Sequence, residues 1–479
     1  MKRLLLATCL TLIAVPAAAP AQVQSISASD RKSGAAAHPQ LVQQFGGAMK
    51  GPAADYVARV GRRIAVQSGL SNSERDFTVT LLDSPVNNAF AIPGGYVYVT
   101  RGLLTLMNDE AELASVLGHE VGHVAARHAV KRQQTATITS VLAGLVGAVA
   151  GNSGMGGLVG RAAGTGADLI TKGFSRTQEY QADDLGVRYL STAGYDPLAS
   201  SNMLGILGAQ EALEARIAGR KDALPSWAST HPNSADRVKR AADKAAATGQ
   251  AGRGLRNRDA LLDAVDGMIW GDDPAKGFLD GREFKLPLQR LAFTVPKDFA
   301  VDNGDDAVTI SASSGQASFS GGRIGMGGLD DYIGQVFSKL GGNAGPEAIR
   351  SGRASGIEFR YAFAQANSNA GPVDVGVFAY RPDNGATAYH FVTLTRAGQG
   401  VGPFQPLVES MRRMSAAEAQ GVRPLRVKVL KVKAGETSDT FARMMAFPDA
   451  PLDRFLVLNA LDRADRLTPG QRVKVIVRN

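Results

Sequence analysis

The sequence predicts a multidomain α+β protein, and three observations support this fold class. Its 479 residues are enough for about three domains. A composition of 44% hydrophobic and 20% charged residues suits packed cores and excludes a disordered, collagen-like or multi-span membrane protein. The apolar pattern changes near residue 280 from helical spacing to short alternating runs. We expect a mostly helical domain with a small sheet over 22–248, a linker over 249–280, an antiparallel α+β domain over 281–415 and a β-α-α-β module over 424–479.

The first 21 residues (1–21) are typical of a secretory signal peptide. A basic start at Lys2 and Arg3 precedes an apolar run and a small-residue stretch. An uncleaved anchor helix is the alternative, but the apolar run is shorter than the roughly 20 residues that span a bilayer. The one cysteine, Cys9, lies in this segment, so the mature chain offers neither a disulfide nor a thiolate metal site. These features predict a location in the periplasm or cell envelope.

Helical and strand patterns alternate in the first domain. A helical spacing of apolar residues is followed by two β-rich runs, at 38–70, 77–82 and 96–100. A long helix is expected from Asn108 as its N-cap to Lys131 and Arg132 at its basic end. Another begins with a capping box at Ser175 and ends near Gly194, and further helix follows.

The middle domain shows short alternating runs separated by Gly, Asn and Asp turns. They predict strands of an antiparallel sheet at 291–295, 308–311, 357–364, 373–380 and 389–395. Helical stretches are expected at 329–340 and 404–414. The middle domain holds no catalytic constellation, so we expect it to have a structural or recognition role.

The segment His119-Glu120-Val121-Gly122-His123 carries the chemistry. On a helix, residues i and i+4 project from one face, so the two imidazoles can bind one metal ion. Glu120 lies beside them and can take a proton from a metal-bound water. Two incidental histidines on a helix are the alternative.

A catalytic zinc with three protein ligands needs one more, and Glu179 is the best candidate. Asp183 follows on the same helical face, where it can accept a hydrogen bond from the non-ligating nitrogen of a zinc-bound histidine. An ordinary solvated acidic face explains the same spacing. His38 and His128 are assigned no part in the chemistry. His128 would lie about 180° round the helix from His119.

Four motifs occur in order along the chain. They are Asn-Ala-Phe-Ala-Ile-Pro-Gly-Gly at 88–95, the histidine motif at 119–123, Ser-Arg-x-x-Glu-x-x-Ala-Asp at 175–183, and Thr-His-Pro at 230–232 with Arg237. Together they resemble the HtpX/CAAX-prenyl-protease family of gluzincin zinc metallopeptidases, in particular its soluble bacterial periplasmic branch. The similarity covers roughly residues 38–245.

The resemblance implies a zincin-type catalytic domain that binds one Zn²⁺ per chain. Its ligands would be His119, His123 and Glu179, with Glu120 as the general base and Asp183 in the second shell of the metal. His231 would face the metal, where it stabilises the oxyanion or gates the site. From the residues alone, a histidine before a proline is more often structural.

The implied reaction is hydrolysis of peptide bonds by metal-activated water. We expect the β-rich run 96–100 to be an edge strand that pairs with an extended substrate through main-chain hydrogen bonds. Asn88, Tyr96, Val97 and Tyr98 are therefore expected to contact the protein or peptide substrate. A plain sheet strand fits the same pattern.

Residues 133–160 contain no charged residue and seven glycines. We expect a mobile apolar flap or hairpin beside the cleft that touches the membrane surface or a hydrophobic substrate. A buried helix pair is the alternative, and a transmembrane helix would be short.

The tail resembles a lysin-motif (LysM) module in its stretches 432–437, 456–461 and 467–475. Peptidoglycan binding is what this resemblance implies. Residues 421–479 carry a net charge of +6, which favours anionic cell wall or lipid headgroups over nucleic acid outside the cytoplasm. A solvated basic face is the alternative.

The sequence therefore predicts a zinc endopeptidase of the bacterial cell envelope that cleaves misfolded or unassembled envelope proteins. One alternative is a zinc-dependent chaperone or assembly factor for outer-membrane proteins with latent proteolysis. The other is a wall-anchored scaffold. The oligomeric state is not predicted.

Overall fold

The computed structural model describes residues 26–70, 76–129, 174–218, 231, 235–304, 307–342, 348–368, 371–383 and 385–478. The expected signal peptide (1–21) and the apolar segment 133–160 lie outside these residues. Within the described ranges, no helix combines the length and the apolar character that a membrane span requires.

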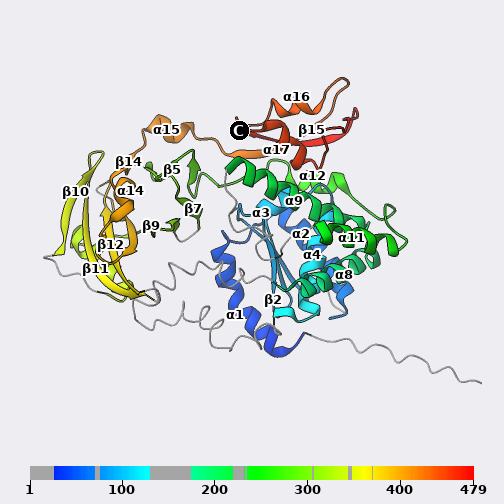
Figure 1. Cartoon of the computed structure of the whole chain (residues 1–479), viewed down its shortest axis with the longest axis horizontal. Helices are drawn as coiled ribbons and strands as arrows, with labels where there is room; N and C mark the ends of the chain where they lie inside the picture. The colour runs from blue at the N-terminus through cyan, green and yellow to red at the C-terminus, as the bar shows by residue number, and fades with distance from the viewer. Residues whose placement is uncertain are drawn as a thin grey trace, which may run out of the picture.

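The N-terminal domain packs helices around a three-stranded sheet (Figure 1). Its elements are α1 (Ala28–Gln44), α2 (Pro52–Ala65), β1 (Thr78–Leu82), β2 (Ala89–Ile92), β3 (Tyr96–Thr100), α3 (Arg101–Leu106), α4 (Glu110–Ala125), α8 (Arg176–Thr192), α9 (Leu198–Ala218) and α11 (Ala235–Ala247). The strand order is β1-β3-β2, with β3 parallel to β1 and antiparallel to β2.

The expectation that residues 96–100 form an edge strand is wrong, because β3 is the central strand. Val97 pairs with Val79 on one side and Ala91 on the other. β1 is paired on its outer side as well, where the Met49 amide donates to the Leu81 carbonyl at 2.9 Å. Among the described residues, no strand pairs with the outer edge of β2. β2 packs against α4.

Helix α4 is almost entirely buried. Its N-cap is Asp109, one residue after the expected Asn108, and the Asp109 carboxylate accepts a hydrogen bond from the Glu112 amide at 3.0 Å. The helix ends at Ala125, before the expected Lys131 and Arg132, and Arg127 then adopts a left-handed conformation with φ of 56°. The chain therefore turns back immediately after the second histidine of the motif.

Small residues allow α4 and α8 to approach closely. A Cβ atom added to Gly122 would lie 3.0 Å from the Ala182 carbonyl oxygen, and one added to Gly186 would lie 3.2 Å from the His119 amide. At its start, α8 has the capping box that the sequence predicts at Ser175, with reciprocal hydrogen bonds to Gln178. The close packing brings the first turns of α8 beside the histidine motif of α4.

The middle domain consists of two antiparallel sheets with one helix on its outer face (Figure 1). The small sheet has the order β14-β6-β5-β4 and the large sheet β10-β11-β12-β13-β9-β8-β7. The elements are β4 (Phe278–Asp280), β5 (Glu283–Leu286), β6 (Leu291–Thr294), β7 (Ala300–Asn303), β8 (Val308–Ala312), β9 (Gly315–Arg323), α13 (Gly328–Lys339), β10 (Arg350–Ala354), β11 (Ile357–Ser368), β12 (Gly371–Tyr380), β13 (Thr387–Arg396), α14 (Gln405–Glu409) and β14 (Arg412–Arg413). The helix expected over 404–414 is shorter, since α14 ends at Glu409 and β14 follows.

One face of the large sheet packs an aromatic core against the small sheet and α14, with Phe293 and Phe391 fully buried. The other face packs small residues against α13, including Ala362 and Ala379.

The tail folds in the order β15 (Leu425–Lys431), α16 (Ser438–Ala442), α17 (Pro451–Leu458) and β16 (Arg472–Arg478), after a short helix α15 (Ala416–Gly421). Its two strands pair antiparallel, with Val427 opposite Ile476. The β-α-α-β order agrees with the sequence pattern.

The segment 249–280, expected to be a linker, is structured. It contains α12 (Arg258–Val265), whose Leu261 and Val265 are fully buried in the N-terminal core. After α12 the backbone pairs with β15, where the Trp270 amide donates to the Leu425 carbonyl at 2.8 Å. The middle domain therefore leaves the rest of the protein and returns to it through neighbouring antiparallel segments.

The tail is docked onto the N-terminal domain. Its apolar residues, including Phe455 and Val473, belong to the same hydrophobic core as α2 and α4. The fully buried ammonium group of Lys474 donates hydrogen bonds to three carbonyl oxygens at the C-terminal end of α3, those of Thr105, Leu106 and Met107, at 2.8, 3.1 and 2.6 Å. Figure 1 shows the tail lying over the helices of this domain.

Candidate metal centre

The two motif histidines point their Nε2 atoms toward one another from a single face of α4. These atoms are 3.0 Å apart, and both side chains are buried. The i, i+4 spacing on a helix places them together, as expected.

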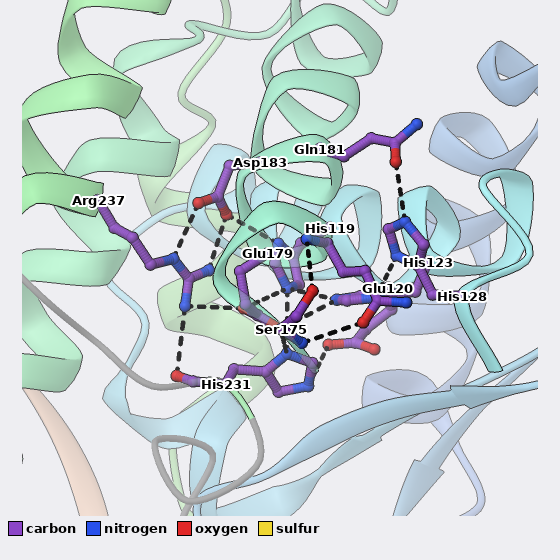
Figure 2. A network of polar contacts seen from close by, with 11 residues as sticks. His119, Glu120, His123, His128, Ser175, Glu179, Gln181, Asp183, His231 and Arg237 are labelled. Atoms are coloured by element: carbon purple, nitrogen blue, oxygen red, sulfur yellow. Dashed lines mark hydrogen bonds and ion pairs between the residues drawn. The ribbon is translucent and has the colours of Figure 1, made fainter. Parts of the chain in front are cut away.

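Two more side chains complete the cluster, one from α8 and one from the segment before α11 (Figure 2). Carboxylate oxygens of Glu179 lie 3.5 Å from Nε2 of His119 and 3.5 Å from Nε2 of His123. Nδ1 of His231 lies 3.2 Å from His119 Nε2 and 3.0 Å from Glu179 Oε1. All four residues are buried, and their donor atoms lie within 4.8 Å of one another.

The spacing of these donor atoms fits a tetrahedral zinc site. Bonds of about 2.0–2.1 Å to a tetrahedral zinc separate its donors by about 3.3 Å. Five contacts among the four side chains are 3.0–3.5 Å long, with both Glu179 carboxylate oxygens taking part, and one donor atom from each residue lies within 4.8 Å of the others. Imidazole nitrogen and carboxylate oxygen are also donors that zinc prefers. The cluster is therefore suited to a single zinc ion.

Burial controls the protonation of these donors. It lowers the pKa of His123 well below its ordinary value, and the neighbouring His119 and His231 lower it further. The neutral imidazole is the form that binds a metal. Burial raises the pKa of Glu179 to about 7, against the opposing charges of His119 and Arg237. The Glu179 carboxylate therefore gains from a nearby cation that keeps it ionised.

Asp183 lies beside the cluster, with Oδ1 2.9 Å from Nδ1 of His119. The guanidinium of Arg237 donates to both carboxylate oxygens of Asp183, at 2.9 and 2.8 Å, and lies 2.9 Å from Glu179 Oε2. Burial alone would raise the pKa of Asp183, but the hydrogen bonds from His119 and Arg237 outweigh it and hold this pKa far below its ordinary value. Asp183 is therefore an ionised acceptor for His119.

The sequence alone did not suggest this role for Arg237. Its guanidinium also donates to the His231 carbonyl at 3.3 Å. One buried arginine thus connects α8, α11 and the segment that carries His231. Its place in the fourth motif, after Thr-His-Pro at 230–232, was the signal available in the sequence.

Glu120 is buried, and its Oε1 lies 3.5 Å from Nε2 of His231. It follows His119 directly on α4, so its carboxylate lies at the side of the cluster (Figure 2). A carboxylate in this position can exchange a proton with a group bound at the fourth corner of the site.

His128 also reaches the site, although the sequence analysis assigned it no role. Its Nδ1 lies 2.9 Å from Nδ1 of His123, and its Nε2 lies 3.1 Å from Oε1 of Gln181 on α8. The angular argument that excluded His128 assumed a continuous helix, whereas α4 ends at Ala125. Phe174 was also missed, and it stacks on the His123 ring with centroids 3.9 Å apart.

The residues expected to contact substrate do not form an exposed strand edge. Val97 and Tyr98 on the central strand are fully buried, and Tyr96 is half-buried. The Tyr98 hydroxyl lies 2.8 Å from Nδ1 of His38. Asn88 is buried, and its backbone N–H donates to Thr100 Oγ1 at 3.0 Å. Among the described residues, the outer edge of β2 is the strand edge of this sheet that has no partner strand.

Comparisons with known proteins agree with this geometry. Residues 53–245 match the family model described as peptidase family M48. The mitochondrial metalloendopeptidase OMA1 of Schizosaccharomyces pombe is 31% identical over 211 residues, which are 43% of this chain and 57% of that protein. The beta-barrel assembly-enhancing protease of Escherichia coli (strain K12) is 32% identical over 197 residues, 40% of this chain and 38% of that protein. The protease of the same name from Yersinia pestis is 34% identical over 165 residues, 32% of each chain.

These matches cover 57% or less of the length of the three relatives. The matched region is the domain that holds the cluster, and it includes all four donor residues. The matching family model is that of peptidase family M48, which is broader than the HtpX-like branch expected from the sequence.

Proposed function

We propose that this protein, whose residues 53–245 form a zinc metalloendopeptidase domain of the M48 type, acts as an endopeptidase of the bacterial cell envelope. The observation that carries the proposal is the buried cluster of His119, His123, Glu179 and His231 with Glu120 at its side. Its donor separations match one tetrahedral zinc ion, and a carboxylate stands next to the ligands as a base.

The residues of the cluster have different roles in the proposed reaction. His119, His123 and Glu179 would hold the metal, which when bound lowers the pKa of a water molecule and polarises the scissile carbonyl. Glu120 takes a proton on its carboxylate and delivers it to the leaving amine. Asp183 accepts the Nδ1 proton of His119, which keeps the Nε2 lone pair directed at the metal.

His231 sets the resting state of the site in this proposal. Its Nδ1 lies at the fourth corner of the cluster, the position that a catalytic zinc site keeps open for water or substrate. We assign His231 as a gate, so that the described arrangement is a closed one. This closure is also the observation that favours the second candidate, a zinc-dependent chaperone or assembly factor for outer-membrane proteins with latent proteolysis.

We propose that an extended segment of a misfolded or unassembled envelope protein pairs with the outer edge of β2, which takes the place first expected for residues 96–100. Main-chain pairing of this kind recognises backbone and tolerates many side chains. Support comes from the packing of β2 against α4 and from the names of the relatives, two of which are beta-barrel assembly-enhancing proteases. The envelope location is proposed from the signal peptide expected over 1–21 and from the resemblance of the four motifs to the soluble periplasmic branch.

The tail remains a candidate for peptidoglycan or membrane-surface contact through its LysM-like stretches. A cavity of about 550 Å³ lies at the base of β15 and β16 and is lined by Lys431, Gln471, Arg472 and residues of α12. Its lining is polar and basic, which suits a polar or anionic ligand such as the cell wall. The wall-anchored scaffold is less well supported, because a scaffold has no use for a complete set of metal ligands.

The experiment compares three variants for zinc content and for cleavage of an unfolded protein such as casein. Glu120→Gln should keep one zinc per chain and lose cleavage by about 10²–10⁴-fold, while His119→Ala should lose both. Glu358→Gln, an exposed glutamate of β11, is the matched control and should behave as wild type. Wild-type cleavage by Glu120→Gln would contradict the assignment of the base.

A further inference from the structure

His128 is the polar residue of the site for which the proposed reaction gives no role. Its side chain is 1% exposed, and both of its ring nitrogens have partners. It reaches the cluster because the left-handed conformation at Arg127 turns the chain back toward α8. Figure 2 shows it on the side of His123 opposite to His231.

The proton positions along this contact follow from the metal site. His123 directs Nε2 toward the cluster, so Nε2 must be unprotonated and Nδ1 must carry the proton. That Nδ1–H donates to Nδ1 of His128 across 2.9 Å. His128 is then protonated on Nε2, which donates to Oε1 of Gln181 across 3.1 Å. Every donor in this series of hydrogen bonds therefore has an acceptor.

The two ligand histidines are thus supported by different partners. His119 donates to the ionised Asp183, which is itself held by Arg237. His123 donates to a neutral imidazole. The cluster already buries three carboxylates, those of Glu120, Glu179 and Asp183, with one arginine. A fourth carboxylate beside His123 would add an uncompensated buried charge, whereas a neutral acceptor orients the ring without that cost.

Packing reinforces the hydrogen bond. The ring of Phe174 stacks on the face of His123 at an interplanar angle of 25°, while His128 meets its edge at 72°. The His123 ring is therefore fixed in both its tilt and its rotation about χ2.

We propose that His128 is a positioning residue for zinc, which fixes the tautomer and the orientation of His123 and links them to α8 through Gln181. This proposal rests on the proposed function only in that His123 must be a zinc ligand. Partners of this kind change metal affinity by 10–100-fold when they are removed.

The test compares the zinc dissociation constants of the full-length variants, measured by competition with a chromogenic chelator. His128→Leu keeps the approximate volume but has no acceptor, and we expect it to bind zinc about 10–100-fold more weakly. His128→Asn places an amide oxygen near the position of Nδ1, and we expect it to restore most of the affinity. His390→Leu, which replaces a partly buried histidine of the middle domain, should bind zinc as wild type does.

A second readout separates positioning from folding. The visible absorption spectrum of the Co²⁺-substituted protein reports ligand geometry, and His128→Leu should alter its band positions while His128→Asn and His390→Leu should not. Wild-type zinc affinity in His128→Leu would overturn the proposal, and so would an equal loss in His128→Asn. Undiminished zinc binding by His123→Ala would instead overturn the ligand assignment on which the proposed function depends.

Discussion

Replacing Lys474 with methionine tests whether the tail is an integral part of the catalytic unit. Methionine has a similar length but no charge and no donor. The substitution leaves three carbonyl oxygens at the end of α3 without the ammonium group that now caps them. Burial raises the pKa of Glu112 and lowers that of Lys474, each to about 7, and each charge favours the other, so the substitution removes one member of a mutually supporting pair.

The expected loss of stability follows from these contacts. Removing one partner of a buried charged network costs about 3–5 kcal/mol, because the remaining polar groups stay buried and unpaired. The double variant Glu112→Gln/Lys474→Met should lose less than the sum of the two single variants, since it removes both charges.

The assay is equilibrium unfolding in urea followed by tryptophan fluorescence, because Trp270 lies in the same interface. The matched control is Lys428→Met on β15, whose ammonium is half-exposed and lies 3.8 Å from Asp266. This control should change the free energy of unfolding by about 0.5 kcal/mol or less. Equal midpoints for Lys474→Met and Lys428→Met would refute the claim that Lys474 anchors the tail.

Three further outcomes follow from the structure. Arg237→Met should weaken zinc binding by about 10–100-fold, measured by chelator competition, because Asp183 and Glu179 lose their shared cation. His231→Ala should keep zinc and hydrolyse a short unfolded peptide several-fold faster, measured by fluorescence release, because the fourth corner of the cluster is opened. Burial lowers the pKa of His390 from 6.5 to about 4, so the folded state binds fewer protons than the unfolded state. The contribution of His390 to stability should therefore be intact above pH 6.5 and fall by about 3 kcal/mol as the pH drops to 4, and His390→Gln should reduce the fall measured by urea unfolding by that amount.

A different result would contradict each of these three predictions. Unchanged zinc affinity in Arg237→Met would show that the two carboxylates need no buried cation. Loss of hydrolysis in His231→Ala would contradict a gate and favour an oxyanion role. A slope as steep as that of the wild type in His390→Gln would show that His390 does not contribute to the acid sensitivity.

Local sequence signals predicted much of the metal centre. The i, i+4 spacing of His119 and His123 requires only a helix, and the capping box at Ser175 starts the helix that carries Glu179 at the expected place. These features depend on residues close together in the chain, so periodicity and capping rules are enough to find them.

Features that depend on distant segments were not predictable in the same way. The central position of β3 results from parallel pairing with β1, which no local pattern encodes. The role of His128 depends on a helix end at Ala125 that has neither a proline nor a glycine to mark it. The docking of the tail depends on Lys474, a charged residue that the alternating pattern of its strand would place on a solvated face.

Anomalous diffraction at the zinc absorption edge, from crystals of the zinc-loaded protein, would show whether His119, His123 and Glu179 bind one zinc ion. We expect a single peak about 2.0–2.2 Å from Nε2 of His119, Nε2 of His123 and a carboxylate oxygen of Glu179. A peak bound by other residues, or no peak between these three in protein that contains one zinc per chain, would contradict this expectation.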